Sequence, residues 1–175
     1  MTRRGIEAFL GLFEKWNQQI NLSAARTRAE LEEHVRDSQA VVPLLKGQRR
    51  VIDVGAGGGF PVVVAAIELP EIQFVALEPV HKKHAFLRTV RRELGLDNFD
   101  PLAERVEDHP DRDYDAAMSR ATFDLAEWLS RGLELVHPGG FVLGFEAIPQ
   151  PLSIPVERVA YDLSGKSRAI VIARR

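Results

Sequence analysis

The sequence of 175 residues contains no cysteine, which excludes disulfide bonds, thiolate catalysis and cysteine-ligated zinc. Long hydrophobic runs are also missing. The longest, Val62–Ile67, is far shorter than the ~18 residues that a membrane-spanning helix needs. The N-terminal apolar stretch is interrupted by Glu7 and by Glu14, which is atypical of a signal peptide. These absences together lead us to expect a soluble, cytoplasmic protein.

A strong charge of one sign is missing as well, since 23 Lys and Arg face 25 Asp and Glu, for a net charge of −2. This balance excludes a strongly basic protein that coats nucleic acid. It does not exclude recognition of a specific nucleic acid, because a basic face can lie on a nearly neutral molecule. The five histidines show no metal-binding spacing with a second ligand, so no metal site is predicted.

The chain divides into a helical first part, residues 1–48, and an alternating second part, residues 49–175. Apolar residues at helical spacing run from Ile6 to Ile20, and a second helix opens at the capping box Thr27–Glu30 and ends near Gly47. Strands are then expected at Val51–Val54, Ile72–Leu77, Phe99–Ala103, Ala116–Ser119 and Phe141–Phe145, with helices at Val62–Leu69, Val80–Leu94 and Leu125–Val136.

Alternating strands and helices predict an α/β fold with a mostly parallel, doubly wound, Rossmann-like sheet. Because Pro101 cannot donate to a neighbouring strand, its segment is either an edge strand or not a strand. The last two strands, Val156–Leu163 and Ala169–Ala173, are joined at Ser164–Lys166 and read as an antiparallel hairpin. One domain with an N-terminal helical extension is therefore expected.

A glycine-rich loop follows the first strand of this sheet. Gly55, Gly57 and Gly59 alternate directly after Asp53, where the backbone can turn tightly and approach a ligand. In open α/β sheets, ligands bind at the carboxyl ends of the strands. A tight turn without a ligand is the alternative that such a loop leaves open.

A second acidic residue favours a cofactor over a simple turn. Glu78 ends the second strand, where a carboxylate can accept hydrogen bonds from ribose hydroxyls of NAD or of S-adenosyl-L-methionine. The loop spacing departs from the G-x-G-x-x-G pattern that brings a helix N-terminus to a pyrophosphate. Asp53 before the loop suits the ammonium group of S-adenosyl-L-methionine better than a pyrophosphate. We therefore expect S-adenosyl-L-methionine as the cofactor.

Motifs along the chain resemble one known family. The motifs before the loop Asp53–Pro61 are Trp16–Ser23 and His34–Ser38. Those after it are Lys82–Leu87, Arg105–Asp108 and Ser119–Ala121. In order and spacing these are similar to motifs of the small-subunit ribosomal RNA guanine-N7 methyltransferases, the glucose-inhibited division protein B family. The resemblance covers about residues 9–143. It implies a class I S-adenosylmethionine-dependent methyltransferase fold and a single methyltransferase domain over residues 1–175.

The resemblance also implies a set of site residues. It places the cofactor at Gly55 and Phe60, at Val106 and Glu107 beside the adenine, and at Arg120. Arg120 follows a strand end directly, where a side chain points into the ligand crevice.

The implied acceptor, guanine N7, is a lone pair without a proton, so no general base is expected. Arginine is suited to donate to N7 and O6, although Arg120 is equally suited to a cofactor carboxylate. Asn21 is a second catalytic candidate, and Ser23, His34, Arg36 and Asp37 are candidates for contacting or shaping the base pocket, with capping or packing as the competing interpretation of each.

The implied partner is small-subunit (16S) ribosomal RNA in a partly assembled small ribosomal subunit, bound by a monomer. The candidate RNA face comprises Arg26, Arg28, Arg36, Arg49, Arg50, Lys82 and Lys83.

The chain departs from the family pattern at two places. Val62 stands where a glycine is usual, and Glu146–Ala147 stands where the family has a Lys-Gly pair, which would put an anion near the RNA cleft. Two alternatives therefore remain beside the RNA guanine-N7 methyltransferase. One is a methyltransferase of the same fold acting on another RNA or a small molecule, and the other is a non-catalytic protein that binds cofactor or RNA.

Overall fold

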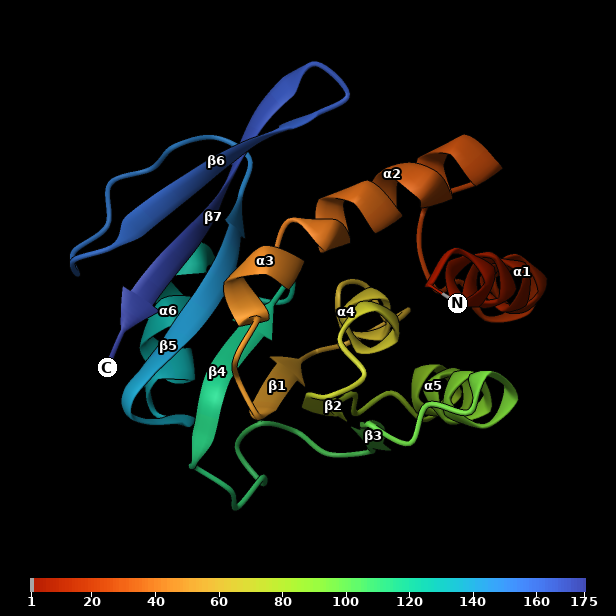
Figure 1. The fold of residues 1–175 in the computed structure, drawn as a ribbon, viewed down its shortest axis with the longest axis horizontal. Coiled ribbons are helices and arrows are strands. Elements are labelled where there is room, and N and C mark those ends of the chain that lie inside the picture. Colours follow the sequence, from red (N-terminus) through yellow and green to blue (C-terminus); the bar gives the residue numbers. More distant parts are fainter. Residues whose placement is uncertain (1) are drawn as a thin grey trace.

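A computed structural model describes residues 2–175 and contains one seven-stranded sheet with helices on both faces (Figure 1). The strand order is β3-β2-β1-β4-β5-β7-β6. Strands β1 to β5 pair in parallel, and β7 pairs antiparallel with both β5 and β6. The strands are β1 Arg50–Val54, β2 Gln73–Leu77, β3 Phe99–Leu102, β4 Tyr114–Ser119, β5 Val136–Glu146, β6 Glu157–Leu163 and β7 Lys166–Arg174. The expected doubly wound sheet with a C-terminal hairpin is confirmed.

The helices divide between the two faces of the sheet. They are α1 Thr2–Ile20, α2 Arg28–Gln39, α3 Val42–Leu45, α4 Val62–Glu68, α5 His81–Leu94 and α6 Leu125–Leu133. Alternate residues of β1 enter opposite cores, because side chains alternate along a strand. Val51 belongs to the core cluster that includes residues of α1, α2, α4 and α5, whereas Ile52 belongs to the cluster that includes Trp128 of α6. The glycine loop, which directly follows β1, therefore begins between the two hydrophobic cores on either side of the sheet.

The N-terminal helices share the core of the sheet. Phe9 and Phe13 of α1 are fully buried and contact Phe60 and Phe86, with ring centroids 5.1 to 6.4 Å apart. Fully burying such a side chain contributes about 1.5–3 kcal/mol. The helical extension is thereby fixed directly over the glycine loop. Within residues 2–175, no helix combines the length and the apolar character needed to cross a membrane.

Local signals set several helix ends. Thr27 and Glu30 form the predicted capping box of α2. The Asp124 side chain also caps α6, and Gly95 ends α5 in the left-handed conformation. Ser164 and Gly165 have φ of 55° and 80°, which suits the tight turn between β6 and β7.

Several boundaries differ from the expectation. The second helix does not continue to Gly47 but breaks at Ala40 and Val41, and Pro43 lies in the first turn of the separate helix α3, because proline cannot donate within a continuous helix. The last helix ends at Leu133, β5 begins already at Val136, and β7 begins at Lys166. Of the two alternatives for the Pro101 segment, the structure shows the edge strand.

Candidate active site

The glycine loop is held against the end of the neighbouring strand β2. The N–H groups of Gly55 and Ala56 both donate to the Leu77 carbonyl, at 2.9 and 3.0 Å. Gly55 has φ of 73°, and a Cβ at this position would lie 2.3 Å from Oγ1 of Thr122, which donates to the Gly55 carbonyl. Gly55 is therefore required both by the backbone conformation and by the close approach of the segment after β4.

Gly57 and Gly59 differ in role. Gly57 has φ of 54°, and a Cβ at this position would have its nearest neighbouring atom 3.9 Å away, so its face of the loop is open. A Cβ on Gly59 would lie 2.6 Å from Cγ2 of Val63. Gly59 thus lets helix α4 pack against the loop and does not line a cavity, whereas Gly57 does.

Glu78 is buried and braces the loop from the end of β2. Its Oε2 accepts the N–H of Gly57 at 2.7 Å, and its Oε1 accepts the N–H of Val80 at 2.9 Å. Each carboxylate oxygen can accept a further hydrogen bond. Glu78 is therefore in place to bind hydroxyl groups of a ligand over the loop.

Asp53 is buried without a partner. Within residues 2–175, its two carboxylate oxygens are the buried side-chain oxygens that receive no hydrogen bond. Burial raises the pKa of Asp53 well above its ordinary value and the Glu78 carboxylate adds to this, while the Arg120 guanidinium and the nearby backbone N–H of Val62 oppose it. An unpartnered buried carboxylate costs stability. It fits a cationic ligand group, and the residues present therefore fit S-adenosyl-L-methionine.

Arg120 lies directly after β4 and is mostly buried. Its Nη1 donates to Oδ2 of Asp37 on α2 at 2.9 Å, and its guanidinium lies 5.5 Å from the centroid of the Phe60 ring. The other oxygen of Asp37 accepts the hydroxyl of Tyr161 on β6 at 2.6 Å. This network joins an N-terminal helix, the end of a central strand and the C-terminal hairpin.

Three cavities share Arg120, and one of them, of about 530 Å³, is lined by His34, Asp37 and Arg168 among others. The other two carry the glycine loop and the aromatic side chains. The glycine-loop pocket has a volume of about 350 Å³ and is lined by Gly55, Gly57, Phe60, Glu78, Arg120 and Thr122, among others. The aromatic pocket has a volume of about 430 Å³ and is lined by Asp37, Arg120, Phe123, Trp128, Phe145 and Tyr161, among others. A larger hollow of about 900 Å³ between α5 and β3 contains none of these residues. The chemistry is therefore concentrated where the smaller cavities meet.

Asn21 lies away from both pockets. It is exposed, has φ of 56° and follows the end of α1, so it terminates that helix. It borders a separate hollow with Asn17 and Thr27. Ser23, by contrast, lines the glycine-loop pocket. The structure thus does not bring Asn21 to the other candidate residues.

Val106 and Glu107 do not line the glycine-loop pocket either. Val106 is buried in the core cluster that contains Val54 and Leu77, the last residues of β1 and β2. Glu107 is exposed and forms an ion pair with Arg131 at 2.8 Å. These two residues lie beside the strand ends rather than over the loop.

The sequence did not single out Thr122 and Tyr161, nor the aromatic residues Phe123, Trp128 and Phe145 of the second pocket. Thr122 lies two residues after Arg120, so its proximity to a strand end was a usable signal. Tyr161 lies 124 residues from its partner Asp37, and no local pattern links them.

Glu146 does not present a free anion. Its carboxylate is buried and accepts hydrogen bonds from Nε and Nη2 of Arg158 at 2.7 and 3.0 Å. These hydrogen bonds lower the pKa of Glu146. The expected anion near the cleft is therefore compensated by a cation from the hairpin.

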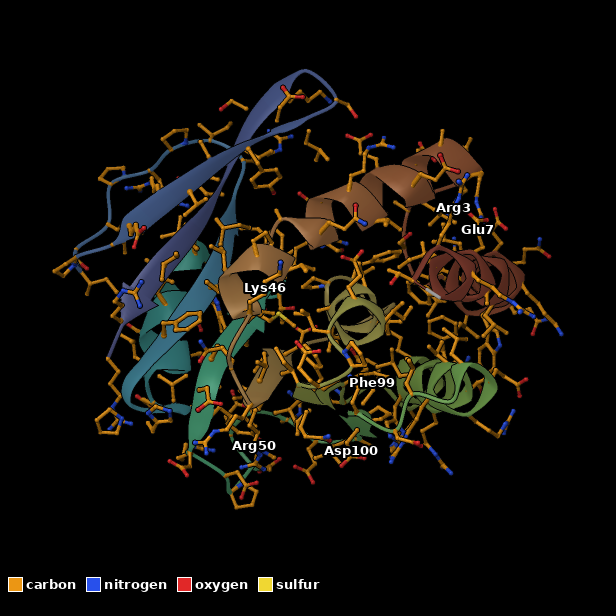
Figure 2. The ribbon with its side chains drawn as sticks, viewed as in Figure 1. Arg3, Glu7, Lys46, Arg50, Phe99 and Asp100 are labelled. Atoms are coloured by element: carbon orange, nitrogen blue, oxygen red, sulfur yellow. The ribbon has the colours of Figure 1, made fainter. Side chains whose placement is uncertain are left out.

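The expected RNA face is wrong as a single surface. Arg50 lies at the start of β1 (Figure 2), and Arg49 directly precedes it, so both are at the end opposite the glycine loop. Arg50 pairs with Asp111 at 2.5 Å. Arg28 is held by Glu7 and Glu14. The pattern of charges along the sequence did not show which cations lie on the same side of the sheet.

Comparison with known proteins adds a family. The model of the rRNA small subunit methyltransferase G (GidB) family matches residues 3–160. The chain is 43% identical over 134 residues to the ribosomal RNA small subunit methyltransferase G of Laribacter hongkongensis, a match that covers 75% of this chain and 64% of that protein. It is 36% identical over 180 residues to the protein of the same description from Neisseria gonorrhoeae, covering 96% and 87%.

Solved structures resemble the fold at low sequence identity. The S-adenosylmethionine-dependent methyltransferase SibL has a TM-score of 0.64 at 19% identity, over 83% of this chain and 55% of SibL. A putative O-methyltransferase from Klebsiella pneumoniae has a TM-score of 0.62 at 16% identity, over 95% and 89%. These likenesses show the class I methyltransferase fold.

Proposed function

The chain belongs to the rRNA small subunit methyltransferase G family of S-adenosylmethionine-dependent methyltransferases, and from this premise we propose that it methylates N7 of a guanine in 16S ribosomal RNA. The structural observation that carries the proposal is the position of Arg120 between the glycine-loop pocket and the aromatic pocket. One pocket accommodates the methyl donor and the other accommodates the base. A group in the wall of both can orient the two reactants toward each other.

We assign cofactor binding to the residues around the glycine loop. When bound, S-adenosyl-L-methionine supplies an electrophilic methyl group on a sulfonium. Asp53 neutralises the ammonium group, Glu78 accepts the ribose hydroxyls, and Gly55 and Gly57 allow close approach of the backbone. The unpartnered Asp53 carboxylate supports this assignment. Phe60 forms part of the wall of the glycine-loop pocket and underlies Arg120.

Two further cofactor assignments have less direct support. Gly59 contributes by permitting the packing of α4 against the loop. Val106 packs against the end of β2 beside Glu78, which supports a place for Val106 and Glu107 next to the adenine. Asn21 has no part in the proposal, because it borders a different hollow.

The acceptor base fits the chemistry of the aromatic pocket. Phe123 and Trp128 stack with ring centroids 6.0 Å apart, and Phe145 and Tyr161 line the same cavity. Aromatic side chains are the usual partners of unstacked RNA bases. Guanine N7 attacks as a lone pair and releases no proton, so Arg120 serves by donating hydrogen bonds and not by acting as a base.

The remaining features of the proposal concern the substrate and the state of the protein. We propose one methyltransferase domain, acting as a monomer in the cytoplasm on a partly assembled small subunit. The shared core of the N-terminal helices and the sheet supports one domain. The few cations near the pockets favour a structured ribosomal particle over naked RNA.

Nucleoside mass spectrometry tests the proposed function. 16S ribosomal RNA is isolated from cells with and without this chain, and from cells complemented with the wild type or with Arg120→Ala. Loss of one 7-methylguanosine, restored by the wild type alone, supports the proposal. Loss of a different modified nucleoside indicates another substrate, and an unchanged profile indicates a non-catalytic protein. Glu146 no longer favours these alternatives, since Arg158 compensates its charge.

A further inference from the structure

Tyr161 reaches the active site from the last part of the chain. Its hydroxyl donates to Oδ1 of Asp37 at 2.6 Å, while Nη1 of Arg120 donates to Oδ2 of the same carboxylate at 2.9 Å. The side chains of Asp37 and Arg120 are 15% and 18% exposed. Both oxygens of Asp37 are therefore committed, one to the hairpin and one to Arg120.

The remaining donors of Arg120 stay free for ligands. Within residues 2–175, the guanidinium makes no hydrogen bond other than the one to Asp37. One face of the guanidinium lies over the Phe60 ring at 5.5 Å. A guanidinium has five N–H donors in a fixed plane, so one hydrogen bond and one ring contact set the direction of the others. The orientation of Asp37 thus decides where the free donors point.

We propose that Tyr161 is a positioning residue for methyl transfer, whose hydroxyl orients Asp37 so that Arg120 presents its free donors to the two adjoining pockets. The inference rests on the proposed function. It assigns the C-terminal hairpin a role in the active site. The hairpin strands β6 and β7 lie at the edge of the sheet, beyond the parallel strands whose ends bind ligands in this fold.

The environment of Tyr161 suits a permanent donor. Burial raises the pKa of Tyr161, and the hydrogen bond and the charge of Asp37 raise it further. The phenol therefore remains protonated throughout the neutral range. Without this donor, Oδ1 of Asp37 loses its partner, and a free donor of Arg120, which already bonds the other oxygen, can take its place. A bidentate grip by Asp37 would then turn the guanidinium away from the pockets.

A purely structural role is the competing explanation, in which the hydroxyl only fastens the hairpin to α2. The chain offers a control, because Tyr114 is buried and its hydroxyl also shares a hydrogen bond with a side chain, Nε2 of His109, at 2.8 Å. Tyr114 starts β4, at the end of the sheet opposite the pockets. Tyr161→Phe and Tyr114→Phe therefore remove the same group from the two ends of the sheet.

The first measurement compares these two variants in melting temperature, in dissociation constant for S-adenosyl-L-methionine and in methyl transfer to small subunits from cells lacking the enzyme. We expect Tyr161→Phe to raise the dissociation constant about threefold and to lower kcat/KM about tenfold, since small misplacements of an orienting group are costly. Tyr114→Phe should change both within about twofold, whatever its melting temperature. Unchanged constants for Tyr161→Phe, or equal losses for the two variants, overturn the inference.

The second measurement is a double-mutant cycle with Arg120→Lys, which retains a cation but lacks the planar fork. If Tyr161 acts through Asp37 on Arg120, Tyr161→Phe has little further effect in the Arg120→Lys background. Losses that multiply in the double variant show independent action and overturn the inference. A wild type that binds the cofactor but does not methylate small subunits contradicts the proposed function. In that case the same double-mutant cycle, measured as dissociation constants for S-adenosyl-L-methionine, still decides whether Tyr161 acts through Arg120.

Discussion

Both ends of the parallel strands carry buried carboxylates, but one carboxylate at each end differs sharply in its hydrogen bonding. At the amino edge, where the strands begin, Asp115 accepts the N–H groups of Arg49 and Arg50 at 2.6 and 2.8 Å and pairs with His137 at 3.0 Å. At the carboxyl edge, where the strands end, the carboxylate of Asp53 has no hydrogen bond within the described residues.

The difference separates stability from function. Polar groups at the amino edge satisfy one another, and His109 likewise lies between Glu104 and Tyr114. At the carboxyl edge Glu78, Ser119 and Glu146 are likewise satisfied, and only Asp53 among the described residues is left without a hydrogen bond, which costs stability. Burial alone therefore does not distinguish a binding site from a structural cluster, whereas an unmet hydrogen-bonding requirement does.

The largest expected effect is the loss of cofactor binding in Gly57→Leu. The leucine side chain fills the open face of the loop, while Gly95→Leu provides the matched control. Gly57 and Gly95 have φ of 54° and 61°, and neither has close neighbours. Both variants should lose about 1–2 kcal/mol through left-handed strain. Only Gly95→Leu should keep the thermal stabilisation by S-adenosyl-L-methionine, which is about 2.7 kcal/mol at 100 times its dissociation constant.

The same melting experiment includes NAD, for which no stabilisation of the wild type is expected. A shift with NAD and none with S-adenosyl-L-methionine would contradict the cofactor assignment. Retained binding by Gly57→Leu would show that the ligand does not approach this face of the loop.

Arg120→Ala should lower the rate of methyl transfer about ten- to a hundredfold, because a charge-assisted hydrogen bond contributes about 1.5–3 kcal/mol. The control at the amino edge is Arg50→Ala, which removes an arginine paired with Asp111 and placed 4.4 Å from the Tyr114 ring centroid. It should lower the melting temperature and leave kcat/KM within about twofold. Methyl incorporation and thermal unfolding of both variants are the measurements. Wild-type rates for Arg120→Ala would return this residue to a structural role.

Asp53→Asn and Asp115→Asn should shift stability in opposite directions. The raised pKa of Asp53 means that its ionisation costs folding free energy as the pH rises above the ordinary carboxyl range. At pH 7 the ligand-free Asp53→Asn protein should be at least as stable as the wild type, yet bind S-adenosyl-L-methionine more weakly. Hydrogen bonds from Arg49 and Arg50 lower the pKa of Asp115 despite its burial. Asp115→Asn should therefore lose about 1–3 kcal/mol.

Chemical denaturation and equilibrium binding measure both quantities for these isosteric variants. A clear destabilisation by Asp53→Asn would mean that its carboxylate has a partner in the folded protein. The contrast between an unpartnered Asp53 and a hydrogen-bonded Asp115 would then be wrong.

The smallest expected effect is in the pH dependence of stability. Burial, followed by the charge of Arg120, lowers the pKa of His34, while Asp37, Glu33 and Glu30 oppose this. The unfolded state then binds more protons near pH 6, so His34 makes stability rise as the pH increases toward neutrality. The Pro138 carbonyl and Asp115 raise the pKa of His137, whose stabilisation is present at low pH and is lost as the pH rises.

Melting temperatures at pH 5.5 and 7.5 test these opposite signs. Relative to the wild type, His34→Gln should decrease the gain between the two pH values, and His137→Gln should increase it. The same direction of change in both variants would contradict the assignment.

Much of the fold and part of the site followed from local sequence patterns. The order of strands and helices, the glycine loop and the capping box of α2 are each written in consecutive residues, because side-chain periodicity and backbone preference act over a few positions. Asp53, Glu78 and Arg120 were selected because each follows or ends a strand, and the carboxyl ends of parallel strands meet at one edge.

Boundaries were less predictable where distant segments compete with a local signal. Pro138, Gly139 and Gly140 read as a turn, yet they extend β5. The N–H of Gly139 donates to the Arg175 carbonyl, and the N–H of Arg175 donates to the Gly140 carbonyl. The C-terminal residue thus supplies the hydrogen-bond partners that extend β5, and no residue near Pro138 in the sequence indicates this.

Only the tertiary structure decided which charges meet. Arg120 and Tyr161 share Asp37, and Arg158 compensates Glu146, across separations of 83, 124 and 12 residues. The sequence alone determined that this protein has a doubly wound sheet with an acidic glycine loop at its carboxyl edge. It did not determine that Asp53 stays unpartnered while Asp115 is satisfied. Electrostatic and hydrogen-bonding requirements are met through space, and packing of the hairpin and N-terminal helices against the sheet sets those distances.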